Sequence, residues 1–314
     1  MRPSRRSFLK GALLAGTAAA LPHPALGREE KEPEPEAVGM LYDSTLCLGC
    51  GGCVAACKES NSLPYEGEPK ELDCTAKNVV KTRHLSKPAA DGATQAFVKR
   101  QCMHCVDPSC VSVCMLGALH KEGEGKRDSG GERRGTGIVL WDKELCLGCR
   151  YCQIACAYSI PKFEWKKAVP RIVKCELCRH RAVEGASGPQ RVANPACCEV
   201  CPTGAVIYGR RADLLAEARR RRAGDPARYD AKIFGETDAG GTQVLYLAAA
   251  GVSFRDLGFP TMPPKAPAHL SETVSHAPYL HGLTPIALYA AAAAIIRRNR
   301  RKADEHARRS KDPR

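Results

Sequence analysis

Residues 47–57 read CLGCGGCVAAC and decide the fold class, because they place four cysteines at the spacing C-x2-C-x2-C-x3-C. Three thiolates within seven residues allow one loop to wrap a corner of a cubane iron–sulfur cluster while backbone N–H groups point at the sulfur atoms. Zinc sites normally combine two close cysteines with two distant ligands, and disulfides between such near neighbours would be strained. The spacing therefore predicts iron–sulfur ligation, with zinc and disulfides as the less favoured alternatives.

The cysteines of the chain form four such groups. The first is Cys47, Cys50, Cys53 and Cys57; the second is Cys102, Cys105, Cys110 and Cys114; the third is Cys146, Cys149, Cys152 and Cys156; the fourth is split into Cys175, Cys178, Cys197 and Cys201. All 18 cysteines lie within residues 47–201, and only Cys74 and Cys198 fall outside the four groups. Their density indicates a metal protein or a disulfide scaffold rather than an enzyme with incidental thiols.

The surroundings of the groups also repeat. Residues 42–50 (YDSTLCLGC) parallel residues 141–149 (WDKELCLGC), and each stretch follows a short β-type run, at 38–42 and 138–141. A unit of strand, cysteine loop, short helix and strand is half of a bacterial ferredoxin. The predicted fold class is α+β, with two nested dicluster ferredoxin-like modules within residues 38–210. The outer module would contain residues 38–73 and 172–210, and the inner module residues 96–171.

This nesting predicts which cysteines share a cluster, because in two-cluster ferredoxins the fourth Cys of a group ligates the other cluster. Four [4Fe-4S] clusters are expected, and their ligands are named here sets 1 to 4. Set 1 is Cys47, Cys50, Cys53 and Cys201; set 2 is Cys57, Cys175, Cys178 and Cys197; set 3 is Cys102, Cys105, Cys110 and Cys156; set 4 is Cys114, Cys146, Cys149 and Cys152. Cys197 is preferred to Cys198 because it keeps a three-residue gap before Cys201.

The length and charge of the chain indicate its number of domains and exclude one class of partner. The 314 residues suggest about two domains. The formal net charge of +14 lies mostly in the first ten residues and in residues 297–314. Because no basic stripe is interleaved with stacking aromatic residues, no nucleic acid partner is expected.

Both ends have the character of targeting segments. Arg5 and Arg6, followed by Phe8-Leu-Lys, an apolar run at 11–21 and small residues near Gly27, are typical of a twin-arginine signal peptide over residues 1–27. No Asp, Glu, Lys or Arg occurs in residues 273–296, which predicts a transmembrane anchor at 279–296, with a buried helix as the alternative. The basic tail, 297–314, would stay in the cytoplasm. The cysteine body would therefore lie on the periplasmic side of the inner membrane, joined to its anchor by an extension and Pro-rich spacer at 211–278.

No catalytic residue is predicted. The sequence contains no Ser-His-Asp series, phosphate loop or dinucleotide glycine fingerprint. His104 lies between two cysteines of a complete group, so we expect it to be a hydrogen-bonding neighbour rather than a ligand.

Several stretches carry a resemblance to a known family: residues 41–47 (LYDSTLC), 101–110 (QCMHCVDPSC), 149–152 (CRYC) and 174–178 (KCELC). Together with the order of the four groups, they resemble the HybA-type four-cluster electron-transfer subunits of membrane-bound nickel–iron hydrogenases. The resemblance implies a non-enzymatic subunit that passes electrons between the hydrogenase small and large subunits and the quinone pool, through an integral membrane quinone-reactive subunit. Met115 and Ala157 depart from the family, which usually has Pro at both positions. The alternative is the beta subunit of a molybdopterin oxidoreductase, such as a formate dehydrogenase or a sulfur-compound reductase.

Overall fold

The computed structural model describes residues 30–65, 67–123, 135–167, 170–183, 192–269, 271–272 and 289–301. Residues 30–269 form one compact unit, and the two ends of the chain form a second one. The predicted signal peptide, 1–27, lies outside the described residues, as does most of the predicted anchor.

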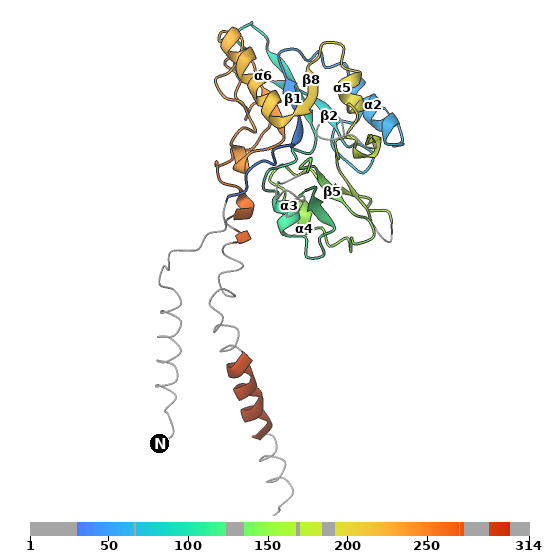
Figure 1. The fold of residues 1–314 in the computed structure, drawn as a ribbon, viewed down its shortest axis with the longest axis vertical. Coiled ribbons are helices and arrows are strands. Elements are labelled where there is room, and N and C mark those ends of the chain that lie inside the picture. The colour runs from blue at the N-terminus through green and yellow to red at the C-terminus, as the bar shows by residue number, and fades with distance from the viewer. Residues whose placement is uncertain are drawn as a thin grey trace, which may run out of the picture. The chain divides into compact units, whose positions relative to one another are not determined.

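The elements of the compact unit alternate between short strands and short helices (Figure 1). The strands are β1 (Val38–Asp43), β2 (Val79–His84), β3 (Gln95–Arg100), β4 (Leu119–Lys121), β5 (Val139–Trp141), β6 (Lys162–Phe163), β7 (Ile172–Val173), β8 (Val206–Arg210) and β9 (Val244–Leu247). The helices are α2 (Gly52–Ser60), α3 (Ser109–Ser112), α4 (Tyr151–Ala155), α5 (Ala196–Glu199) and α6 (Arg211–Gly224), with 3₁₀ turns η1 (Arg179–Arg181) and η3 (Asp238–Gly240).

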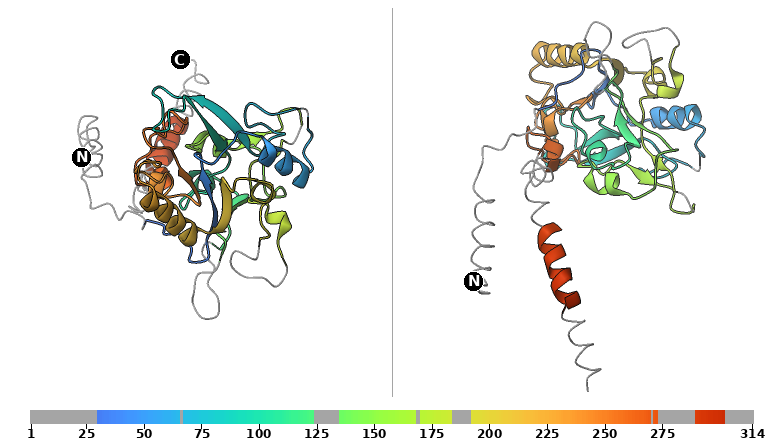
Figure 2. Two further views of the ribbon diagram at one scale, coloured as in Figure 1. Left: turned by 90° about the horizontal axis from the view of Figure 1, so that it is seen from above. Right: turned by 60° about the horizontal axis from the view of Figure 1, so that its bottom comes forward.

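The largest sheet has the strand order β8-β1-β9, and its central strand β1 is buried along its whole length. Side chains alternate between its two faces, as the period of a strand requires. Leu41, Leu245 and Leu247 pack under α6, which lies across this face (Figures 1 and 2). Met40 and Tyr246 face the main core on the other side. Both faces are therefore covered, which explains the continuous apolar run in β1.

Helix α6 begins directly after strand β8. Its buried residues are Arg211, Leu214 and Ala218, which lie on one face because they are three and four positions apart. The Arg211 Nε donates a hydrogen bond to the Thr242 carbonyl oxygen at 2.7 Å. This bond joins the start of α6 to the segment that leads into β9.

Four short helices carry cysteines, and they pack in two pairs. α2 packs against α5, and α3 packs against α4. The strands follow the same pairing, since β1 pairs with β8 and β4 with β5, both antiparallel. The first cysteine group therefore lies beside the fourth, and the second beside the third. Two further hairpins, β2 with β3 and β6 with β7, flank these pairs.

The segment predicted as a Pro-rich spacer packs against the compact unit as far as residue 269. The carbonyl oxygens of Pro263 and Pro264 accept hydrogen bonds from the backbone of Ala239 and Gly240, at 2.8 and 2.7 Å. Ala266 and Ala268 are buried. The residues up to 269 are therefore part of the compact unit, although their prolines suggested an extended spacer.

Beyond this unit, residues 289–301 are helical and carry Arg297, Arg298, Arg300 and Arg301 at their end. Among the residues that the structure describes, no helix is both long enough and apolar enough to span a membrane. The anchor predicted at 279–296 lies outside the described residues up to position 288.

Candidate iron–sulfur sites

The same loop conformation occurs in all four cysteine groups. The residue before the second Cys has a positive φ in each one: Gly49 (69°), His104 (46°), Gly148 (71°) and Leu177 (49°). Positive φ is unstrained for glycine and costly for other residues. His104 and Leu177 adopt it nevertheless, which indicates that the turn itself is required at this position. The loop conformation is therefore the same in all four groups, even where the residue before the second Cys is not glycine.

Each set receives an N–H···S hydrogen bond from the backbone. The donors are Gly49 to Cys47 (3.4 Å), Leu177 to Cys175 (3.4 Å), Ile160 to Cys156 (3.5 Å) and Leu119 to Cys114 (3.3 Å). Such bonds stabilise negative charge on a thiolate and tune the metal that it binds. Each of the four sites therefore provides a backbone N–H group that can stabilise a thiolate.

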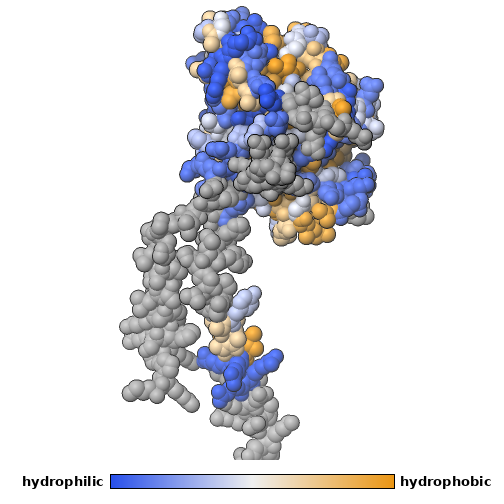
Figure 3. Space-filling model, in the orientation of Figure 1, coloured by the Kyte–Doolittle hydropathy of each residue, from blue (hydrophilic) through white to orange (hydrophobic). Residues whose placement is uncertain are grey.

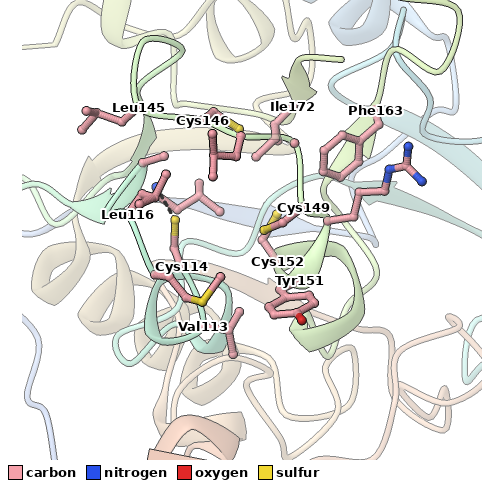
Figure 4. Close-up of a pocket in the computed structure, with 16 residues that line it drawn as sticks. Val113, Cys114, Leu116, Leu145, Cys146, Cys149, Tyr151, Cys152, Phe163 and Ile172 are labelled. Carbon is pink, nitrogen blue, oxygen red and sulfur yellow. Dashed lines mark hydrogen bonds between the residues drawn. The ribbon is translucent and has the colours of Figure 1, made fainter. Parts of the chain in front are cut away.

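Set 4 lines a single cavity of about 460 Å³ between α3 and α4. Figure 4 shows Cys114 on one side of this space and Cys146, Cys149 and Cys152 around the rest of it. The pKa of Cys152 is raised to about 12, by burial first and then by the other three thiols of the set. The four thiols are therefore close enough to oppose one another's ionisation, and a cation between them would relieve this repulsion.

Set 1 lines a second cavity, of about 390 Å³, beside α2. Burial raises the pKa of Cys53 to about 11, and Cys47 and Cys201 raise it further. Cys201 reaches this cavity from the end of α5, across more than 140 residues of sequence from Cys53. The pairing of α2 with α5 is what brings it there.

The thiols of sets 2 and 3 also gather together. The pKa of Cys57 is raised to about 12, by burial first, with smaller contributions from Cys197 and Cys178. Burial likewise raises the pKa of Cys105, and the other three thiols of set 3, Cys156, Cys110 and Cys102, raise it further. Each predicted set is thus a spatial group of thiols.

These groups follow one another through the body. Cys53 of set 1 and Cys197 of set 2 are close enough for Cys197 to raise the pKa of Cys53. Cys175 of set 2 and Cys102 of set 3 both lie near the buried Tyr246 hydroxyl. Cys110 of set 3 is near Cys152 of set 4. The order in space is therefore set 1, set 2, set 3, set 4.

Exposure differs along this series. All four cysteines of set 2 are buried, and set 3 contains two buried and two half-buried ones. Sets 1 and 4 each contain an exposed cysteine, Cys50 and Cys149. The series is closed in its middle and open at both ends.

Exposed apolar side chains surround the opening at set 4. We name them the apolar rim: Met115, Leu116, Leu145, Leu147 and Tyr151. Leu147 and Met115 are the most exposed, at 76% and 74%. In Figure 3 an apolar area lies at the lower end of the body, where Figure 1 places α3 and α4. Soluble proteins rarely expose such a contiguous patch unless it binds a partner. The opening at set 1 has fewer such residues, Leu48 and Val200.

Of the four lysines that are buried among the described residues, Lys58 donates to the Pro64 carbonyl oxygen, and the other three lie among the thiols without having been predicted from the sequence: Lys99, Lys121 and Lys174. The Lys121 Nζ donates hydrogen bonds to the carbonyl oxygens of Cys105 (3.0 Å) and Gly137 (2.7 Å) and to the Gln243 Oε1 (2.7 Å). The Lys174 Nζ donates to the carbonyl oxygens of Val139 and Cys175. The position of Lys174 directly before Cys175 was the available signal in the sequence.

His104 is fully buried, and its Nδ1 accepts a hydrogen bond from the Val139 N–H at 3.0 Å. Burial lowers the pKa of His104 well below its usual value, and the Lys174 and Lys121 ammonium groups lower it further. The imidazole is therefore neutral, and one of its nitrogens is engaged with the backbone. This is the contact of a hydrogen-bonding neighbour.

Cys197 and Cys198 are both buried and are hydrogen-bonded to each other. The pKa of Cys197 is lowered, chiefly because Cys198 hydrogen-bonds to it, with a further contribution from Lys99. Cys198 lines a separate depression with Tyr208 and Val206. Of this pair, Cys197 is the thiol that interacts with Cys57 and Cys175.

The donor sets suit a cluster better than a single ion. Zinc holds its sulfur ligands at about 2.3 Å. Across the described residues, no three His, Cys, Asp or Glu side chains converge closely enough to hold one metal ion. All 18 cysteines are free thiols in this structure. Four thiols around a cavity fit a group of several iron atoms.

Comparisons with known proteins agree with this geometry. Residues 93–211 match the 4Fe-4S dicluster domain family, and residues 2–22 match the twin-arginine translocation signal sequence. The hydrogenase-2 operon protein HybA of Escherichia coli O157:H7 is 36% identical over 96% of this chain and 97% of its own length. The chain belongs to the HybA family. The prediction of a HybA-type protein with a twin-arginine signal, which directs export to the periplasm, is thereby confirmed.

This HybA-family chain is also similar to proteins with other names. The iron–sulfur subunit of the nitrate-inducible formate dehydrogenase of Escherichia coli K12 is 31% identical over 67% of each chain. The NrfC homolog of Haemophilus influenzae is 31% identical over 73% of this chain and 89% of its own length. Both matches cover less of this chain than the match to HybA does.

Proposed function

We propose that this chain is an iron–sulfur electron-transfer subunit that carries electrons through four [4Fe-4S] clusters between a periplasmic nickel–iron hydrogenase and the membrane quinone pool. The observation that carries the proposal is the order of the four thiol sets. They form one series that is buried in its middle and opens to solvent at Cys50 and Cys149. Electron entry at one end and exit at the other require this arrangement.

In this proposal sets 1 to 4 are the ligand sets of the four clusters. A bound [4Fe-4S] cluster supplies a one-electron carrier whose potential depends on hydrogen bonds to its sulfurs and on exposure to solvent. The chain holds the four thiols of each set in place, donates N–H bonds to their sulfurs and excludes water from sets 2 and 3. No acid, base or nucleophile is needed, which agrees with the neutral, backbone-bonded His104.

The apolar rim at set 4 is the proposed docking surface for one of the partners. An electron-transfer partner must bring its own redox centre close to a cluster, and Cys149 lies exposed inside this rim. The partners in the proposal are the hydrogenase small and large subunits and an integral membrane quinone-reactive subunit. We further propose that residues 279–296 anchor the mature chain on the periplasmic side of the inner membrane. The 24 residues from 273 to 296 without Asp, Glu, Lys or Arg, and the basic tail after them, support this anchor.

The second candidate is the iron–sulfur subunit of a molybdopterin enzyme such as a formate dehydrogenase. It is favoured by the 31% identity to formate dehydrogenase subunits. The two candidates share the thiol sets and differ in the catalytic partner. The metal that is isolated together with the chain, nickel or molybdenum, distinguishes the two candidate functions.

The test is to tag the chain, solubilise membranes gently without oxygen, and measure metals in the isolated complex. Four clusters predict roughly 16 irons per chain. Nickel in the same complex supports the hydrogenase relay, whereas molybdenum without nickel supports the second candidate. Zinc without iron would refute both.

Individual ligands are tested by Cys197→Ser and Cys198→Ser. We expect the first variant to lose iron from set 2 and the second to keep the full iron content. The reverse result would assign Cys198 as the ligand.

A further inference from the structure

Lys99 occupies an unusual position between two of the thiol sets. It is the second-last residue of β3, is 1% exposed, and lines the set 1 cavity together with Val80, which it pairs with on β2. The Tyr246 hydroxyl donates a hydrogen bond to its backbone carbonyl oxygen at 2.8 Å. The strand and the tyrosine therefore hold this residue in place.

The ammonium group of Lys99 acts on both adjacent sets. The Lys99 side chain lines the set 1 cavity beside Cys53, and it lies close enough to Cys57, Cys175 and Cys197 of set 2 to interact with them electrostatically. The Lys99 ammonium group is thus close to the thiols of two neighbouring sets.

No carboxylate neutralises this charge in the part of the chain that the structure describes. The Lys99 Nζ donates a hydrogen bond to the neutral Gln101 Oε1, and none of the ion pairs among the described residues includes Lys99. A buried, unpaired ammonium is expensive unless negative charge surrounds it. With clusters bound, the thiolates of sets 1 and 2 would supply that negative charge.

The other buried lysines differ from Lys99 in their contacts. Lys58 donates to the Pro64 carbonyl oxygen, and Lys121 donates to three oxygen atoms that hold backbone segments together. Lys174 donates to two carbonyl oxygens and lies 3.9 Å from the Glu176 carboxylate. Among the described residues, the Lys99 ammonium donates to no backbone carbonyl and lies beside the set 1 thiols instead. Support of the backbone therefore does not explain the position of Lys99.

We propose that Lys99 raises the reduction potentials of the two clusters held by sets 1 and 2. The inference rests on the proposed function. Each cluster takes up one electron from a low-potential redox partner, and no bond or proton is exchanged. The added negative charge is stabilised by the nearby ammonium, and burial keeps this attraction from being screened.

The test compares the anaerobically purified complex of the wild-type chain with those of Lys99→Met, Lys99→Gln and Lys99→Arg. Iron is counted first. Midpoint potentials are then measured by potentiometric titration with dithionite, followed by electron paramagnetic resonance and absorbance. We expect Lys99→Met and Lys99→Gln to lower two of the four potentials, each by a tenfold or larger change in the equilibrium constant, which equals 59 mV for one electron. Lys99→Arg should keep all four potentials, because it keeps the charge.

Lys81→Met is the matched control. Lys81 lies on the neighbouring strand β2, and its ammonium is already paired with the Glu71 carboxylate. Removing it should change no equilibrium constant by more than twofold. Raising the salt concentration should leave the Lys99 effect in place, because a buried charge is poorly screened.

Several outcomes would overturn the inference. Unchanged potentials in an iron-replete neutral variant would do so, as would an equal fall of all four potentials. Loss of iron in both neutral variants, with full iron in Lys99→Arg, would show that the charge holds the clusters rather than tuning them. A wild-type complex without roughly 16 irons per chain would instead refute the proposed function itself.

Discussion

The outer and inner halves of the cysteine body share one spacing motif and differ in what supports it. Sets 1 and 2 lie beside a three-stranded sheet whose central strand is wholly buried and whose far face is covered by α6. Sets 3 and 4 rest on three-residue and two-residue strands. The buried core of this inner half is small, and cysteines contribute to it: Cys110, Leu119, Val139, Cys152, Phe163 and Ile172. The same cysteine spacing is therefore supported by an apolar core in the outer half, whereas in the inner half the cysteines themselves form part of the core.

The largest expected effect comes from removing iron. In the outer half the sheet β8-β1-β9 has a core of its own, whereas in the inner half the thiols of set 4 would repel one another and leave a cavity of about 460 Å³ without contents. Anaerobic treatment with an iron chelator should abolish amide-exchange protection in β4, β5, β6 and β7 while β1, β8 and β9 keep it. Hydrogen exchange with mass spectrometry measures both. Equal loss in the two halves would remove the distinction drawn between them.

A core truncation in the outer half tests its independence from the clusters. Leu245 is fully buried between β1 and α6. Leu245→Ala should lower the free energy of unfolding by about 2–5 kcal/mol through lost burial and the cavity left behind. The midpoint of urea unfolding, followed by circular dichroism, gives the change. Leu215→Ala on α6, at a half-buried position, is the control and should cost less, whereas an equal loss there would show that the sheet contributes little.

The apolar rim distinguishes the opening at set 4 from the opening at set 1. Met115→Glu and Leu147→Glu place a charge on the most exposed positions of the rim, around the cavity that Cys149 also lines. If a partner docks there, electron transfer through the complex should fall roughly tenfold, which corresponds to about 1.4 kcal/mol, with iron content unchanged. Leu48→Glu makes the same change at the set 1 opening. Hydrogen-dependent reduction of a quinone analogue is the assay, and full activity in the double rim variant would exclude this surface.

The smallest effect is expected at Arg150, which occupies the position of Gly51 in the repeated loop. Both residues have positive φ, 67° and 71°. Arg150→Gly removes the strain of a left-handed non-glycine residue, about 1 kcal/mol, but also loses the stacking of its guanidinium on Trp165, about 0.5–1 kcal/mol. The two changes oppose each other, so the unfolding midpoint should hardly move. Trp165→Ala alone should destabilise the inner half slightly, and a large shift in either variant would contradict this balance.

Several features of the site could be predicted because they are local. The spacing within each group constrains three thiols to one loop, whatever the rest of the chain does. The repeat around residues 42–50 and 141–149 predicts two equivalent strands, and β1 and β5 lie there.

Other features depend on contacts between distant segments and left no clear sequence signal. Lys99 looks like an ordinary strand lysine, and only the packing of β3 against the thiol sets buries it. The prolines at 260–267 suggested an extended spacer, yet hydrogen bonds from Ala239 and Gly240 hold Pro263 and Pro264 against the body. Neither contact joins residues that are close in sequence.

The sequence by itself determined the chemistry of this protein: the thiol groups, their iron–sulfur spacing and the twin-arginine signal that the family comparison confirms. Ligand type and local spacing are properties of short segments, so no tertiary structure is needed to recognise them. Only the tertiary structure decided which thiols gather, which sets open to solvent and where the buried lysines lie. These depend on which faces of distant strands and helices bury one another, because burial sets both the exposure of a thiol and the strength of a nearby charge.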